Sequence, residues 1–187
     1  MAEREEIIIG AAMRVFTRYG VRRATMGDIA EEAGVARQTL YNVYAGKEDV
    51  LRAAIRWYAE HSLAVIEAEC AAAATLGEQL DIVFKHTAVK PFELLNESPH
   101  ADDIISGFNA AAREEISHAE KRIRAAIEQL LTPYEAPIRA AGLSPRRLAD
   151  VVQRSYAGFK HKAENKKHLQ ELLTSLKVLV LTLVGAA

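Results

Sequence analysis

The chain has 187 residues, of which 50% are hydrophobic and 26% are charged, with a formal net charge of −1 and one cysteine. This composition can build a globular core, but it excludes an intramolecular disulfide and offers no global basic excess for binding nucleic acid. Residues 1–9 lack the apolar core of a signal peptide. The longest apolar run, 178–184, is far shorter than the ~20 residues of a membrane helix. We therefore expect a cytoplasmic protein with no membrane partner.

The first predicted helix runs from about Glu3 to Tyr19. Its apolar residues share one stripe at helical spacing, and Gly20 provides the break that ends it. The stripe consists of Ile8, Ala12, Val15, Phe16 and Tyr19.

Two short helices are predicted next. Thr25 is typical of a helix N-cap, and Asp28 three residues later completes a capping box with a shorter acid than usual. Gly34 stops this helix after two turns. A third helix follows from Ala36 to about Tyr44, with Leu40 as its inward-facing anchor.

The rest of the chain is also predicted to be helical. Gly46 separates the third helix from a long fourth helix that begins near Lys47. Further breaks are expected at Pro91 and across 132–145, where proline and glycine gather. The later helices are predicted at 76–90, 100–107, 109–131, 145–164 and 167–184. Strand-like alternation is nearly absent, so the fold class is all-α: an N-terminal three-helix domain (1–50) followed by a helical bundle (51–187).

Two short helices joined by a tight glycine turn are typical of a helix-turn-helix. If Leu40 faces inward, the polar side chains of the second of these helices point elsewhere. Arg, Gln, Asn and Thr can read base edges in the major groove, and the candidates here are Arg37, Gln38, Thr39 and Asn42. Tyr41, Tyr44 and Lys47 are candidates for phosphate contacts.

Residues 25–51, TMGDIAEEAGVARQTLYNVYAGKEDVL, together with AAMRVFTRYGVRRAT at 11–25, resemble the DNA-binding region of the tetracycline-repressor-like (TetR) regulators. The resemblance implies base reading by Arg37, Gln38 and Thr39. It implies phosphate contacts for Tyr41 and Lys47, and for Thr25 as a cap that also touches phosphate. Gly27 stands where relatives carry a longer side chain that can reach DNA.

The resemblance further implies a dimer, an effector and an operator. The last two predicted helices carry more apolar surface than one core face needs, which indicates a homodimer through these helices. The dimer would bind a palindromic double-stranded DNA operator as a repressor, and a small molecule would release it. Candidate ligand-lining residues are aromatic, and each is also explained as ordinary core: Phe84, Phe92, Phe108 and Tyr156.

The residues leave two alternatives to a DNA-binding regulator. The chain could be a helical small-molecule-binding or interaction protein whose N-terminal corner is only structural. A helical-bundle enzyme would need clustered titratable groups, and the sequence has no convincing set. Glu114 and His118 form an isolated pair at helical spacing, which lacks the further ligands of a metal site. We therefore expect no enzymatic activity, metal or cofactor.

Overall fold

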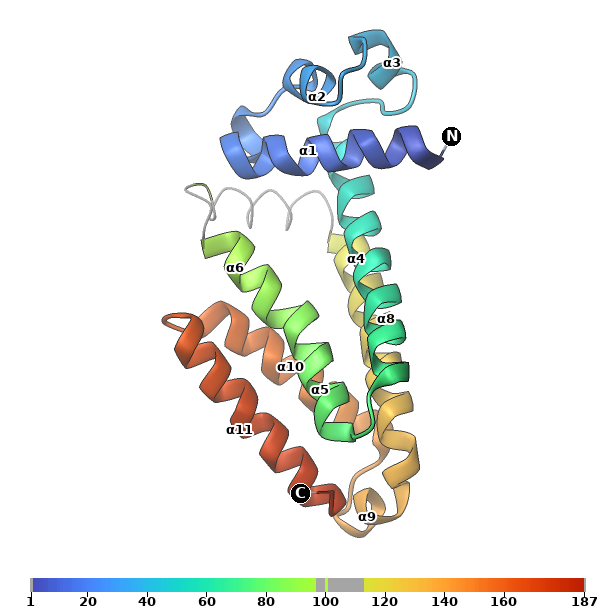
Figure 1. Ribbon diagram of the computed structural model, residues 1–187, viewed down its shortest axis with the longest axis vertical. Coiled ribbons are helices and arrows are strands. Elements are labelled where there is room, and N and C mark those ends of the chain that lie inside the picture. The colour runs from blue at the N-terminus through green and yellow to red at the C-terminus, as the bar shows by residue number, and fades with distance from the viewer. Residues whose placement is uncertain (1, 97–99, 101–112, 187) are drawn as a thin grey trace. The chain divides into compact units, whose positions relative to one another are not determined.

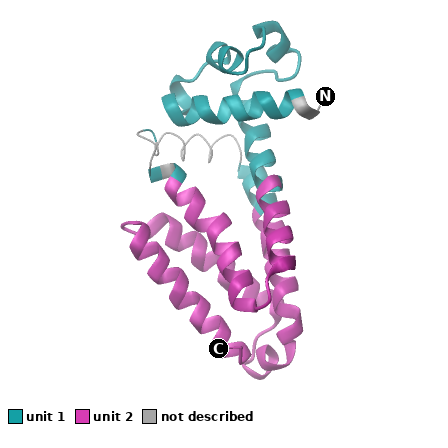
Figure 2. Ribbon diagram, viewed as in Figure 1, with its two compact units in different colours: residues 1–60, 94–119 teal, residues 61–93, 120–187 magenta. Residues whose placement is uncertain are grey.

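The computed structural model describes residues 2–96, 100 and 113–186, and the secondary structure within these ranges is entirely helical (Figure 1). The chain divides into two compact units (Figure 2). Unit 1 comprises residues 1–60 and 94–119, and unit 2 comprises 61–93 and 120–187.

Unit 1 contains α1 (Ala2–Arg23), α2 (Met26–Glu32), α3 (Arg37–Tyr41) and the start of α4 (Lys47–Ala72). Gly20 interrupts α1 with φ 79° and ψ 162°, a conformation that glycine adopts without steric cost. The predicted break at Gly20 is therefore present as a kink, after which helical residues continue to Arg23.

The core of unit 1 is built by the inward faces of α1 to α4. Ile8, Ala12, Val15 and Phe16 of the predicted stripe are buried, as are Ile29, Leu40, Val50 and Leu51 on the other helices. The prediction for Tyr19 was wrong, because its side chain is 43% exposed and its ring lies beside the Arg18 guanidinium. Glu32 of α2 also binds Arg14 and Arg18 of α1, with N–O distances of 2.7 and 3.3 Å.

Unit 2 is a helical bundle. It contains the end of α4 and most of α8 (Arg113–Leu131), and the chain between them forms α5 (Leu76–Phe84), a π-helical turn η1 (Lys85–Val89) and α6 (Lys90–Asn96). After α8 come a 3-10 turn η2 (Thr132–Tyr134), α9 (Glu135–Ala140), α10 (Pro145–Lys162) and α11 (Lys166–Val184).

The predicted break at Pro91 was wrong. Pro91 is the second residue of α6, and proline is tolerated in the first turn of a helix. The chain widens into the π turn just before it, where the Lys90 N–H donates to the carbonyl of Lys85. The predicted irregular segment 132–145 likewise contains η2 and α9. The helix predicted at 100–107 and the start of the one predicted at 109–131 lie outside the described residues.

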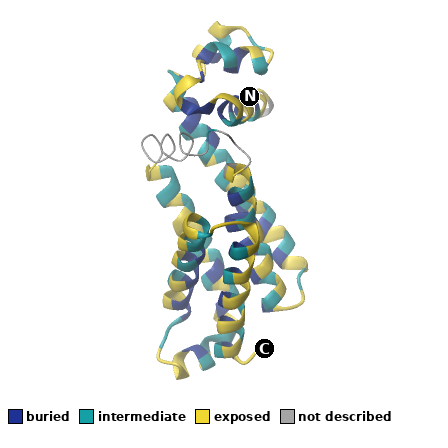
Figure 3. Ribbon diagram, turned by 90° about the vertical axis from the view of Figure 1, so that its left-hand side faces the viewer, coloured by how far each residue is buried: buried dark blue, intermediate teal, exposed yellow. Residues whose placement is uncertain are grey.

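Buried residues line the inward faces of the helices within unit 2 (Figure 3). Leu80, Ile127, Leu131, Ile138, Val152 and Leu169 are fully enclosed. None of the helices in the described ranges is long and apolar enough to cross a membrane.

Candidate nucleic-acid interface and bundle interior

The start of α2 is fixed by a reciprocal capping box. Thr25 Oγ1 accepts a hydrogen bond from the Asp28 N–H at 3.2 Å, and Asp28 Oδ2 accepts one from the Thr25 N–H at 2.8 Å. The Thr25 hydroxyl also donates to Asp28 Oδ2 at 2.7 Å. These hydrogen bonds, with a smaller contribution from the charge of Arg37, hold the pKa of Asp28 below its usual value.

The turn between α2 and α3 orients the second helix. Gly34 has φ +66°, and the Val35 N–H donates to the Ala30 carbonyl at 2.9 Å, which closes the end of α2. Leu40 is fully buried in the core of unit 1. With Leu40 inside, α3 is held with one flank against α2 and the other flank free.

The free flank carries the four predicted base-reading residues, which we call the reading face: Arg37, Gln38, Thr39 and Asn42. Arg37, Gln38 and Asn42 are exposed, whereas Thr39 is half-buried. Gln38 Nε2 donates to Asn42 Oδ1 at 3.0 Å, so these two amides are already ordered side by side.

The Arg37 guanidinium lies against Gly27 at the start of α2. A methyl group on Gly27 would collide with Arg37 Nη2 and would lie 2.8 Å from Cζ. The absence of a side chain at Gly27 therefore makes room for the guanidinium of a predicted base-reading residue. The sequence alone did not connect these two positions.

The two predicted tyrosines differ in accessibility. Tyr41 is 51% exposed beside the reading face, whereas Tyr44 is only 8% exposed and belongs to the core of unit 1. Burial raises the pKa of the Tyr44 phenol. Tyr44 is thus placed as a packing residue, and Tyr41 is the more accessible of the two for a phosphate.

Lys47 links the first residue of α4 to the end of α1. Its ammonium donates to the carbonyls of Arg22 at 3.0 Å and Ala24 at 2.9 Å. A cation is favourable at these carbonyls because helix C-termini leave them without intrahelical partners. The predicted phosphate contact therefore already has protein partners, which no local sequence pattern indicates.

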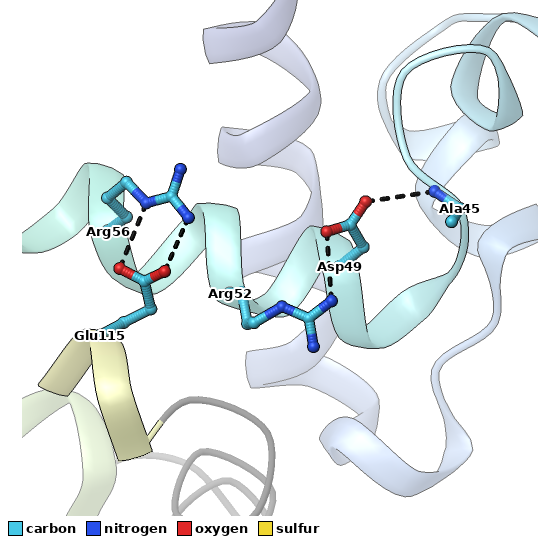
Figure 4. A network of polar contacts seen from close by, with 5 residues as sticks. All are labelled: Ala45, Asp49, Arg52, Arg56 and Glu115. Carbon is cyan, nitrogen blue, oxygen red and sulfur yellow. Dashed lines mark hydrogen bonds and ion pairs between the residues drawn. The ribbon is translucent and has the colours of Figure 1, made fainter.

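The rest of the first half of α4 carries three further polar contacts (Figure 4). Asp49 accepts from the Ala45 N–H at 3.2 Å and from Arg52 at 3.3 Å. One turn later, Arg56 makes a two-point contact with Glu115 at the start of α8, at 2.6 and 3.2 Å. The Arg56 guanidinium holds the pKa of Glu115 below its usual value.

The predicted ligand-lining aromatics fall inside unit 2. Phe84, Phe92 and Tyr156 are all buried, and the rings of Phe84 and Tyr156 lie 6.0 Å apart at an interplanar angle of 59°. Phe108 lies outside the described residues. Three buried polar side chains in the same unit were not predicted: His86 and Thr87 in η1, and Gln153 in α10. The sequence could have indicated these residues, because each is a polar residue at an inward-facing position among apolar residues of its helix.

The described residues contain no group of three or more His, Cys, Asp or Glu side chains that could hold a metal ion.

Comparisons with known proteins point to one family. Residues 8–54 match the model described as "Bacterial regulatory proteins, tetR family". The HTH-type transcriptional regulator TtgW of Pseudomonas putida is 43% identical over 53 residues, which cover 28% of this chain and 40% of TtgW. YezE of Bacillus subtilis, of the same description, is 28% identical over 79 residues, or 42% of this chain and 41% of YezE. The chain thus aligns with about two fifths of the length of these curated relatives.

A solved structure extends the likeness to the whole fold. The transcriptional regulator FadR from Bacillus subtilis, in complex with stearoyl-CoA, has a TM-score of 0.62 and 21% identity. The match covers 97% of this chain and 98% of that one. At this identity the comparison supports the arrangement of helices alone.

Proposed function

Because residues 8–54 match the model of the tetR family of bacterial regulatory proteins, we propose that this chain is a regulator of that family and acts as a dimeric transcription repressor released from its operator by a small molecule. The observation that carries the proposal is the pairing of a fully buried Leu40 with an exposed Arg37 and Gln38 on the same short helix. The buried leucine holds α3 in one orientation. The polar flank can therefore enter a major groove with little loss of conformational entropy.

Each residue of the reading face has a chemically specific role in this proposal. Arg37 is suited to the two acceptors of guanine, and Gln38 to the donor and acceptor of adenine. The half-buried Thr39 offers a methyl group to thymine, and Asn42 holds Gln38 through their hydrogen bond. Thr25 and Tyr41 are both exposed, and in this proposal they contact phosphate oxygens.

The proposed dimer forms through α10 and α11. Both helices bury one side in the core of unit 2, yet Val151 of α10 is 47% exposed, and Val178 and Leu179 of α11 are 52% and 68% exposed. Exposed large apolar side chains on adjacent helices favour a subunit interface. Two-fold symmetry would place two reading faces about 34–36 Å apart, which matches successive major grooves on a palindrome.

The proposed effector binds inside unit 2. Support comes from the aromatic interior formed by Phe84, Phe92 and Tyr156, and from the similar FadR structure, which is a complex with stearoyl-CoA. The effector would favour a conformation in which the two reading faces no longer match the groove spacing. A differential affinity equivalent to about 1–3 kcal/mol between the two forms is typical of such coupling.

The test is selection of bound sequences from a random pool of duplex DNA by the full-length protein. We expect a palindrome, and salt-dependent binding to it. Arg37→Ala should relax base preference at one position of each half-site at a cost of about 1–3 kcal/mol, whereas Tyr41→Phe should weaken all sequences alike.

Arg139→Ala provides the matched control, since Arg139 lies on α9 and makes only an exposed ion pair with Glu135. Failure of the protein to enrich any sequence would contradict the proposal. It would favour a helical ligand-binding or interaction protein in which α2 and α3 form only a structural corner.

A further inference from the structure

Unit 2 contains a buried polar side chain whose hydrogen-bonding groups have no partner among the residues that the structure describes. Of its three buried polar residues, His86 contacts Glu69 at 3.2 Å and Lys90 at 3.4 Å, and Thr87 donates to the Val83 carbonyl at 2.7 Å. Gln153 is 4% exposed, and within the described part of the chain nothing forms a hydrogen bond with its side chain. Buried amides are nearly always paired, so Gln153 needs an explanation.

The position of Gln153 on α10 relates it to two other polar side chains. Gln153, Tyr156 and Lys160 follow one another at intervals of three and four residues, which places them on one face of the helix. The phenol of Tyr156 is buried like Gln153, and α10 packs against η1, which carries Thr87. This face of α10 therefore meets the π turn, and π turns are frequent at binding sites.

Lys160 is the second group without a partner on this face. It is half-buried near the end of α10, and no carboxylate of the described chain lies within ion-pair distance of its ammonium. Burial lowers the pKa of Lys160, and the charge of Glu120 on α8 opposes that shift only in part. The neighbouring Lys162 is exposed, so partial enclosure distinguishes Lys160 from the other lysine in the last turn of this helix.

We propose that Gln153 and Lys160 are the polar contacts of the effector, which is an elongated apolar acid with an uncharged hydrogen-bonding group along its chain. The two residues are seven positions apart on α10, which corresponds to two helical turns, about 10 Å along the axis. The anionic group pairs with Lys160, and the uncharged group lies against the amide of Gln153. Phe84, Phe92 and Tyr156 provide the apolar surroundings. This inference rests on the proposed function, since it assigns the chemistry of the effector.

The role of Lys160 is tested by calorimetric titration of the full-length protein with octanoate and with octanamide, which has the same length but no charge. We expect octanoate to bind more tightly. Lys160→Met should weaken octanoate binding about tenfold and octanamide binding much less, because the attraction between opposite charges is lost only with the acid. Lys162→Met is the matched control and should leave both affinities unchanged.

The role of Gln153 is tested with 8-hydroxyoctanoate against octanoate. The wild type should bind 8-hydroxyoctanoate more tightly than octanoate. Gln153→Leu should lower the ratio of these two affinities about fivefold. The same substitution should raise the melting temperature by a few degrees, because leucine fills similar space without an unpaired amide. A lowered melting temperature would indicate a structural role for the amide and overturn this assignment.

Equal binding of octanoate and octanamide, loss of binding by Lys162→Met as large as by Lys160→Met, or no octanoate binding at all would overturn the inference. Operator binding by the wild-type protein is measured in parallel. If no DNA is bound, the proposed function fails, whereas the titrations still decide whether Gln153 and Lys160 contact an acid.

Discussion

At the scale of single residues, the absence of a side chain at Gly27 determines where the Arg37 side chain can lie. Its missing side chain lets the Arg37 guanidinium lie across the start of α2. This close approach joins two positions ten residues apart. The glycine in α2 therefore determines where the side chain of Arg37, a predicted base-reading residue of α3, can lie.

Gly27→Ala should therefore have opposite effects on stability and recognition. Alanine is the better helix former, so the free energy of unfolding should rise by up to about 1 kcal/mol in urea titrations. The guanidinium must move, so the base preferred at the position read by Arg37 should change. Gly10→Ala is the control, because an added methyl group there lies 3.5 Å from Arg14 Nη1, an ordinary contact. An unchanged operator preference for Gly27→Ala would show that Arg37 does not depend on this position.

The sequence predicts much at this scale. Helix caps, turns and buried helix positions depend on neighbours within a few residues in the sequence. Local patterns therefore indicate the roles of Thr25, Asp28, Gly34 and Leu40. Lys47 is different, because its carbonyl partners lie 23 and 25 positions earlier in the chain. Such a contact follows from tertiary packing, and no pattern of nearby residues indicates it.

At the scale of elements, α2 begins at the capping box of Thr25 and Asp28, and its contribution depends on pH. The pKa of Asp28 is lowered in the folded chain, so the stabilisation is complete above the ordinary pKa of aspartate. It is lost as the pH falls through the lowered value. Acid titration followed by circular dichroism should show this loss, and Asp28→Asn should remove that part of the pH dependence. Thr25→Ala should cost about 0.5–2 kcal/mol at neutral pH. An Asp28→Asn variant with the acid sensitivity of the wild type would contradict this role.

The elements that the sequence misplaced share a cause. Pro91, Pro133 and Pro137 all suggested interruptions, yet Pro91 lies in the first turn of α6, Pro133 in η2 and Pro137 in α9. Proline lacks only an N–H that the first turn does not use. Whether a proline ends a helix or begins one depends on how the preceding residues pack, as the π turn before Pro91 demonstrates.

At the scale of the whole molecule, the proposed dimer determines whether two reading faces act together. Leu179→Glu would place a charge at the most exposed apolar position of α11. We expect the dimer to dissociate by sedimentation or light scattering, and operator affinity to fall steeply because a monomer binds only one half-site. Gln170→Glu adds the same charge on a different, exposed flank of α11 and should leave the dimer intact. A dimeric Leu179→Glu protein would place the interface elsewhere.

The ammonium of Lys47 has one more consequence. By holding the last carbonyls of α1, it ties the base of α4 to the helix that supports α2 and α3. Farther along α4, the Arg56 guanidinium donates two hydrogen bonds to the Glu115 carboxylate of α8. Within unit 1, these contacts join α4 to both α1 and α8, so a change in the direction of the first turns of α4 should also shift the end of α1.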